Sequence, residues 1–200
     1  MDREKLFLAL AGRKIEPFWF ETGSEAAAFL ASELRKKKIV FGGSQTLKEL
    51  GLYELLSEEN DVFWHWIKKD IVARRQAEIE AGVYIASANA ISETGEIVNM
   101  DGSCNRVANL AYGHEHVIYV AGVNKVVPTL EDAIDRVRNI AAPLNSKRGG
   151  SNTPCTGTDE IRCNDCRSED RSCRVMTITM FRPRLVKSMQ LILINQNLGL

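Results

Sequence analysis

Four of the five cysteines of this chain gather in one segment, at Cys155, Cys163, Cys166 and Cys173. Four thiolates at the spacing C-x7-C-x2-C-x6-C can complete a tetrahedral shell around zinc or hold an iron–sulfur cluster. The segment 147–174 has almost no aliphatic side chains, so a bound metal would supply the order that an apolar core gives elsewhere. We predict a metal at this cluster, zinc or [4Fe–4S]. The alternatives are a redox or disulfide role of the thiols, or four reduced thiols in a mobile loop.

A second candidate site lies where a buried strand over residues 39–41 meets a helix that starts near Thr46. Gly42 and Gly43 would let a ligand approach the backbone, and free N–H groups at the helix start favour an anion such as phosphate or carboxylate. The motif lacks both the G-x-G-x-x-G and the Walker pattern. A tight turn followed by a helix cap at Ser44 is the alternative interpretation.

A third set of polar residues follows predicted strands, where open α/β sheets bind their ligands. Glu93 could act as a general base or nucleophile, Arg106 could bind a carboxylate or phosphate, and Lys125 could supply a point charge. Ordinary turn chemistry is the alternative, with Arg106 paired locally to Asp101. The other ligand-binding candidates are Asn89, Thr94, Gly95, Asp101, Asn105 and Asn124 in this set, with Ser44 and Thr46 at the strand-to-helix turn.

These groups need a sheet to position them, and the first two-thirds of the chain alternates between strand-like and helix-like patterns. Strands are expected at 39–41, 61–66, 83–86, 96–99 and 116–121. Helices are expected at 24–37, 68–81 and 105–111, with two more that start near 46 and 129. Pro143 should end the last of these helices. Such alternation predicts a mainly parallel sheet with flanking helices, an α/β fold.

The end of the chain has a different pattern. Residues 175–181 and 189–194 are strand-like with only a Pro-containing connection between them, which predicts an antiparallel β pair within 175–200. Residues 1–20 are assigned to an N-terminal helix or arm. With the cysteine segment as a long loop, we expect a single domain over residues 1–200.

Composition narrows the function classes. Lys plus Arg and Asp plus Glu both number 26, so the formal net charge is zero, which argues against a nucleic-acid binder. No apolar run is long enough for a transmembrane helix, and the N-terminus does not resemble a secretory signal. Five cysteines without an export signal indicate a reducing compartment, so we expect a cytoplasmic protein.

Several ordered blocks of the sequence resemble the LUD-domain family, in particular its lactate-utilisation protein C-type members. The blocks are residues 41–47, 88–99, 101–108, 120–125 and 138–143, and the cysteine segment looks like the Cys-bearing branch. The resemblance implies a Rossmann-like fold similar to the sugar-phosphate isomerase and CoA-transferase superfamily. It also implies a part in oxidation of L-lactate to pyruvate beside partner proteins with iron–sulfur clusters. Cys104 departs from the pattern, since a small residue such as Gly is expected there.

Three functions follow as hypotheses. The first is an accessory or ligand-binding subunit of lactate oxidation whose crevice holds a small anionic ligand, a carboxylate or a phosphorylated molecule. The second is a free-standing enzyme of CoA-transferase or sugar-phosphate isomerase type, with Glu93 or Asp101 as base or nucleophile. The third is a scaffold that docks other subunits through the cysteine segment. An oligomer is compatible with all three.

Overall fold

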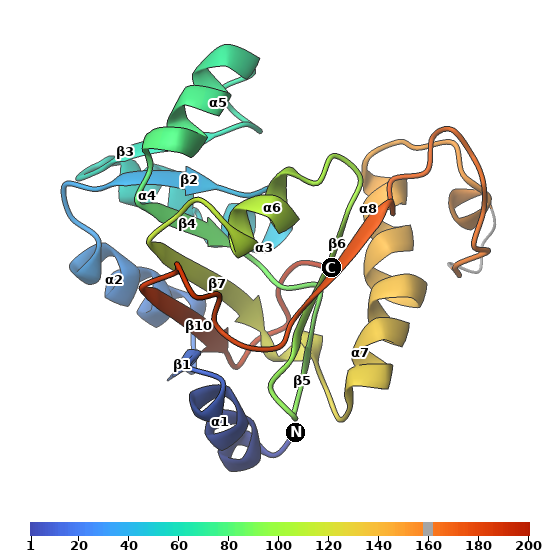
Figure 1. Ribbon diagram of the computed structural model, residues 1–200, viewed down its shortest axis with the longest axis horizontal. Helices are drawn as coiled ribbons and strands as arrows, with labels where there is room; N and C mark the ends of the chain where they lie inside the picture. The colour runs from blue at the N-terminus through green and yellow to red at the C-terminus, as the bar shows by residue number, and fades with distance from the viewer. Residues whose placement is uncertain (158–161) are drawn as a thin grey trace.

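The computed structural model of this chain describes residues 1–157 and 162–200, so residues 158–161 of the predicted cysteine segment lie outside the described part. Six strands form one sheet in the order β1-β10-β7-β4-β2-β3, and every neighbouring pair is parallel (Figure 1). The strands are β1 (Glu16–Phe20), β2 (Lys38–Phe41), β3 (Asp61–Trp64), β4 (Val83–Ala86), β7 (His116–Gly122) and β10 (Ser188–Ile194). The predicted parallel α/β sheet is confirmed.

Different helices cover the two faces of this sheet, because successive side chains of a strand point to opposite faces. Phe41 and Ile85 pack on the face covered by α2 (Gly23–Glu33), α3 (Gln45–Glu49) and α4 (Leu52–Ser57). Tyr84 and Tyr119 pack on the other face, with α1 (Arg3–Gly12) and α6 (Asn105–Ala111). The amphipathic α5 (Ile71–Glu80) packs against β2 and the edge strand β3, and none of its residues is fully buried.

A smaller sheet lies beside the first, in the order β8-β5-β6-β9. Its strands are β5 (Ala90–Ser92), β6 (Ile97–Asp101), β8 (Val126–Val127) and β9 (Val175–Thr179). Ala90 and Val98 of this sheet pack with Ala133 and Val137 in a third, small core. The helix α7 (Leu130–Arg136) therefore packs on the smaller sheet, and α8 (Ala142–Arg148) continues the same helical column beyond it (Figure 1).

Pro143 does not end the helix that begins after Thr129, contrary to the prediction. A turn of π-helix over Val137–Ala141 follows α7, and Pro143 lies in the first turn of α8 beyond it. A proline is tolerated there, because the N–H that it lacks needs no partner within the new helix. The column therefore continues to Arg148.

The predicted antiparallel pairing of the two C-terminal strands is wrong. β10 inserts between β1 and β7 of the large sheet, whereas β9 pairs antiparallel with β6 of the small one. The burial of the two strands explains the separation. Residues 191–194 of β10 are all buried, which suits a central parallel strand, while β9 leaves Val175 and Ile178 exposed at an edge.

The N-terminal arm predicted over residues 1–20 consists of α1 and β1. The cysteine segment contains only a short 3₁₀ turn, Pro154–Thr156, among its described residues after α8. Within residues 1–157 and 162–200, no helix combines the length and the apolar character that crossing a bilayer requires.

Candidate functional site

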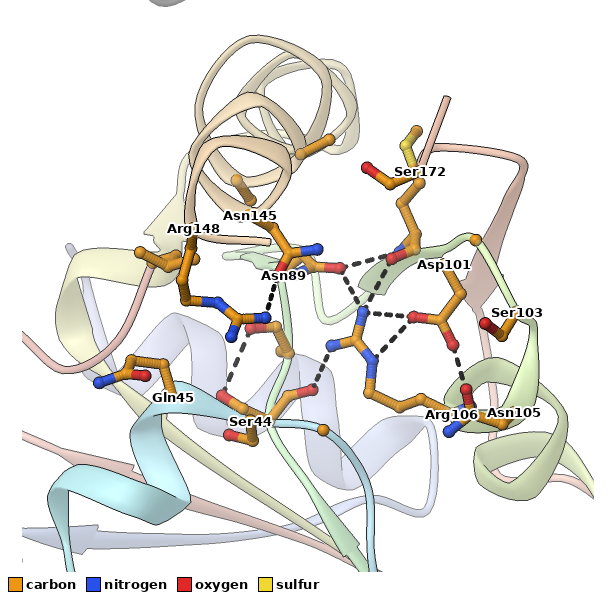
Figure 2. A pocket seen from close by; sticks show the side chains of 18 of the residues that line it. Ser44, Gln45, Asn89, Asp101, Ser103, Asn105, Arg106, Asn145, Arg148 and Ser172 are labelled. Atoms are coloured by element: carbon orange, nitrogen blue, oxygen red, sulfur yellow. Dashed lines mark hydrogen bonds and ion pairs between the residues drawn. The ribbon is translucent and has the colours of Figure 1, made fainter. Parts of the chain in front are cut away.

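Polar segments from both halves of the chain meet in a crevice of about 250 Å³ (Figure 2). The crevice lies at the carboxyl ends of β2, β3, β4 and β7. After the adjacent strands β2 and β4 the chain continues in opposite directions, toward β3 and toward β7, which is where open α/β sheets form ligand sites. Of the predicted site residues, those that line the crevice are Gly43, Ser44, Asn89, Asp101, Asn105, Arg106 and Lys125.

The strand-to-helix turn after β2 forms one side of the crevice. Ser44 caps α3, its Oγ accepting a hydrogen bond from the N–H of Leu47 at 3.2 Å, as the alternative interpretation proposed. The two glycines leave space for side chains of the protein rather than for a ligand. A Cβ atom added to Gly42 would lie 2.8 Å from the hydroxyl of Tyr84, and a Cβ atom added to Gly43 would lie 2.9 Å from Nε1 of Trp66. Gly42 itself is outside the lining.

Arg106 does not present its guanidinium as a free ligand clamp. Its Nε and Nη2 donate to Oδ1 of Asp101 at 3.0 and 2.8 Å, and Nη2 also donates to Oδ1 of Asn89 at 2.8 Å. The backbone N–H of Arg106 donates to Oδ2 of Asp101 at 2.9 Å. The local pairing that sequence analysis offered as the alternative is therefore present. It joins the start of α6 to β6 and to the loop after β4.

Lys125 is the most buried cation of the crevice, with 3% of its surface exposed. Its Nζ donates to Oγ1 of Thr46 and to Oγ of Ser87, both at 2.9 Å, so the predicted residue Thr46 takes part through Lys125. Burial, and after it the nearby cations Arg136 and Arg106, lower the pKa of Lys125 to about 7. An amine in this state is close to its charge transition near neutral pH.

The opposite wall carries residues that sequence analysis did not select. Arg148 at the end of α8 reaches over the ring of Trp66, with its Cζ 4.7 Å from the ring centroid, and its Nη2 donates to Oδ1 of Asn145 at 2.7 Å. Figure 2 shows Arg148 across the crevice from Asp101 and Arg106. His65 and Trp66 directly follow β3, which ends at Trp64, whereas the predicted strand over 61–66 placed both residues inside it. Arg148 follows no strand, and no sequence signal marked it.

Ser172 also lines the crevice, although it belongs to the cysteine segment. Its hydroxyl forms a hydrogen bond with that of Ser146 on α8, and a Cβ on Gly102 would lie 2.8 Å from its carbonyl oxygen. The cysteine segment therefore contributes to the crevice wall through the residue that precedes Cys173.

The structure does not bring Glu93, Thr94 or Gly95 to the crevice. These residues form the turn between β5 and β6, where Oε1 of Glu93 accepts from the N–H of Asp2 at 2.9 Å and lies 3.6 Å from the N-terminal amine. The carbonyl of Thr94 accepts from Nε of Arg13 at 2.9 Å. The turn fastens α1 to the small sheet.

Asn124 lies next to the crevice but bonds to the chain itself. Its Oδ1 accepts from the N–H of Leu198 at 3.1 Å, and its carbonyl accepts from Nε of the buried Arg136 at 3.1 Å. Cys104 has a φ of +60° directly before α6, a left-handed conformation that glycine adopts without strain. This explains why a small residue is expected at that position.

The four clustered thiols are free and partly exposed. Arg171 organises their segment, since its Nη1 donates to the carbonyl of Cys166 at 2.6 Å and its Nε to that of Cys173 at 2.8 Å. In the described part of the chain, no three His, Cys, Asp or Glu side chains converge as a metal site would require. In this arrangement the described thiols do not form the ligand shell of a zinc ion or a cluster, so no chemistry is derived from a metal here. The metal expected from the cysteine spacing is a matter for metal analysis in solution.

Comparison with known proteins agrees with the fold and covers nearly the whole chain. The model of the LUD domain matches residues 4–194. The crystal structure of a DUF162 family protein from Deinococcus radiodurans is similar over 97% of this chain and 99% of that chain, with a TM-score of 0.57 and 12% sequence identity. At this identity the likeness concerns the fold alone. No curated protein matches the chain.

Proposed function

The chain belongs to the LUD domain family, and from that premise we propose that its crevice binds a small carboxylate anion, L-lactate or pyruvate. In this proposal the protein is a ligand-binding component of L-lactate oxidation, located in the cytoplasm, that works with iron–sulfur partner proteins. Membership of the LUD domain family supports the proposed role in lactate oxidation. The positive charges of the crevice support the proposal that its ligand is an anion.

One observation supports the binding of an anionic ligand: two cationic side chains of the crevice have no acidic partner. Lys125 donates only to hydroxyl groups, and Arg148 rests on Trp66 and Asn145. Neither takes part in an ion pair of the described residues. The acidic side chain among the lining residues, Asp101, is already neutralised by Arg106. The crevice therefore has an excess of positive charge, which favours an anionic ligand.

The rival hypothesis, a free-standing transferase or isomerase, needs a carboxylate that can act on a bound substrate. Glu93 bonds to the N-terminal residues outside the crevice, and Asp101 accepts four hydrogen bonds from Arg106 and the N–H of Val107. The carboxylate oxygens of Glu93 and of Asp101 are therefore not available to take a proton from a ligand in the crevice. The geometry thus favours binding over this chemistry.

Isothermal titration with L-lactate and with pyruvate tests the ligand. We expect both to bind and lactamide, the uncharged analogue of lactate, not to bind. Arg148→Ala should weaken binding about tenfold, the effect of one charge-assisted hydrogen bond. Lys147→Ala is the matched control, because Lys147 is an exposed cation on the same helix outside the lining. Equal affinities for lactate and lactamide would contradict the proposal.

The pathway role has its own test. A strain that lacks this protein should lose growth on L-lactate as the carbon source and keep growth on pyruvate. Complementation with the Arg148→Ala variant should restore growth less well than complementation with Lys147→Ala. Normal growth of the deletion strain on L-lactate would contradict the assignment to lactate oxidation.

A further inference from the structure

Lys125 is a buried amine with an unusual set of neighbours. It lies on the short 3₁₀ turn Val123–Lys125 that follows β7, and it lines the crevice although 97% of its surface is covered by protein. Its two hydrogen-bond partners, Thr46 and Ser87, are neutral hydroxyls. A buried lysine that only stabilised the fold would be expected to face a carboxylate, because an uncompensated buried charge is strongly unfavourable.

The charged groups around Lys125 act mainly against its protonation. Arg136 and Arg106 repel the ammonium, while Glu49 attracts it more weakly than either of them repels it. Together with burial, these cations bring the pKa to about 7. At neutral pH a large fraction of the side chain is therefore the free amine, which is the nucleophilic form.

We propose that Nζ of Lys125 forms a Schiff base with the carbonyl carbon of a 2-oxo acid bound in the crevice, of which pyruvate is the simplest. This inference rests on the proposed function and names the reaction that the same site performs on the oxidised ligand. The hydrogen bonds to Thr46 and Ser87 use the two N–H groups of the neutral amine and leave its lone pair for the carbonyl carbon.

The step balances without any further reactant. The amine lone pair forms the C–N bond, the carbonyl π electrons move to oxygen, and a proton passes from nitrogen to that oxygen. The hydroxyls of Thr46 and Ser87 lie 3.3 Å apart and 2.9 Å from Nζ, so they can carry the proton. The carbinolamine then loses water as the C=N bond forms. No atom is oxidised or reduced.

Reductive trapping tests the inference. The full chain is treated with pyruvate and sodium borohydride at pH 7, digested, and mapped by mass spectrometry. We expect a mass increase of one pyruvic acid less one oxygen atom on Lys125, at least about tenfold above any exposed lysine, because exposed amines are almost fully protonated at this pH. L-lactate has a hydroxyl in place of the keto group of pyruvate, so it should give no adduct and should compete with pyruvate.

Two variants separate the possible outcomes. Lys125→Met should lose the adduct while a cooperative unfolding transition shows that it is folded, and Lys147→Arg should keep the adduct. Labelling spread evenly over exposed lysines would overturn the inference. A missing adduct with pyruvate binding intact in titration would overturn the Schiff base and leave the proposed function standing. A missing adduct together with missing binding would overturn both.

Discussion

The guanidinium of Arg106 is bound through both Nε and Nη2 to Oδ1 of Asp101, at 3.0 and 2.8 Å. Both side chains are 10% exposed, so the pair is nearly buried. Asp101→Asn would leave a buried cation without its counterion. We expect the free energy of unfolding to fall by about 3 kcal/mol, the lower end of the range for breaking a buried ion pair. Denaturant unfolding measures this loss.

The matched control for that measurement is Glu80→Gln, which removes the acid of the exposed ion pair with Lys38. Its effect on stability should be much smaller, because water screens this pair. If Asp101→Asn abolished pyruvate binding with no loss of stability, the role of Arg106 would be to bind the ligand rather than to stabilise the fold.

Glu93 should be dispensable for ligand binding. Its carboxylate accepts a hydrogen bond from the N–H of Asp2 and lies 3.7 Å from Nζ of Lys5 on α1. Glu93 itself lies outside the crevice. We expect Glu93→Gln to bind pyruvate with unchanged affinity by titration and to unfold at a slightly lower denaturant concentration. A strong loss of affinity would restore Glu93 as a residue of the site.

The buried amine of Lys125 should make stability depend on pH. Its pKa is about 7 in the folded protein, below the ordinary lysine value of 10.5. Between these two pH values the unfolded chain therefore binds more protons, and stability rises with pH. Below pH 7 both states are protonated, and the unfavourable burial of the charge is present in full. Relative to Lys125→Met, wild-type protein should gain about 1 kcal/mol per pH unit between pH 7 and about pH 9.

The measurement is a series of denaturant unfolding curves at different pH values for both proteins. Lys147→Met serves as the control, because Lys147 is exposed outside the crevice, and this variant should give a pH dependence equal to that of wild type. Parallel curves for wild type and Lys125→Met would mean that burial does not shift the proton affinity of Lys125.

Metal analysis tests the prediction made from the spacing of the cysteines. Because no three described ligand side chains converge there, we expect protein purified without oxygen and without a metal-affinity tag to hold less than one zinc or cluster per chain. Replacing Cys155, Cys163, Cys166 and Cys173 with Ser should change the free energy of unfolding by no more than about 0.5 kcal/mol.

The opposite result would be informative. A stoichiometric metal that the four-Ser variant loses, together with a clear loss of stability, would show that the segment closes around an ion. Since Ser172 lines the crevice and precedes Cys173, such closure would also be expected to change pyruvate affinity.

The sequence alone determined the parallel α/β sheet and the turns that carry the site. Strand periodicity and helix caps are local, and chains of this alternation place polar turns at the carboxyl ends of strands. That rule brought Ser44, Asn89, Arg106 and Lys125 to one crevice. It failed for Glu93, since the turn that carries Glu93 joins the small sheet instead.

Only the tertiary structure decided which of these groups are free to act. Charge pairing and burial depend on contacts between residues far apart in the sequence, such as Lys125 with Thr46 and Ser87. In the same way, Arg148 reaches the crevice because the helical column continues past Pro143 to the end of α8. The strands β9 and β10 lie in different sheets, as their burial differs. Local sequence patterns do not specify such long-range contacts. These contacts determine both the pKa of Lys125 and the order of the strands around it.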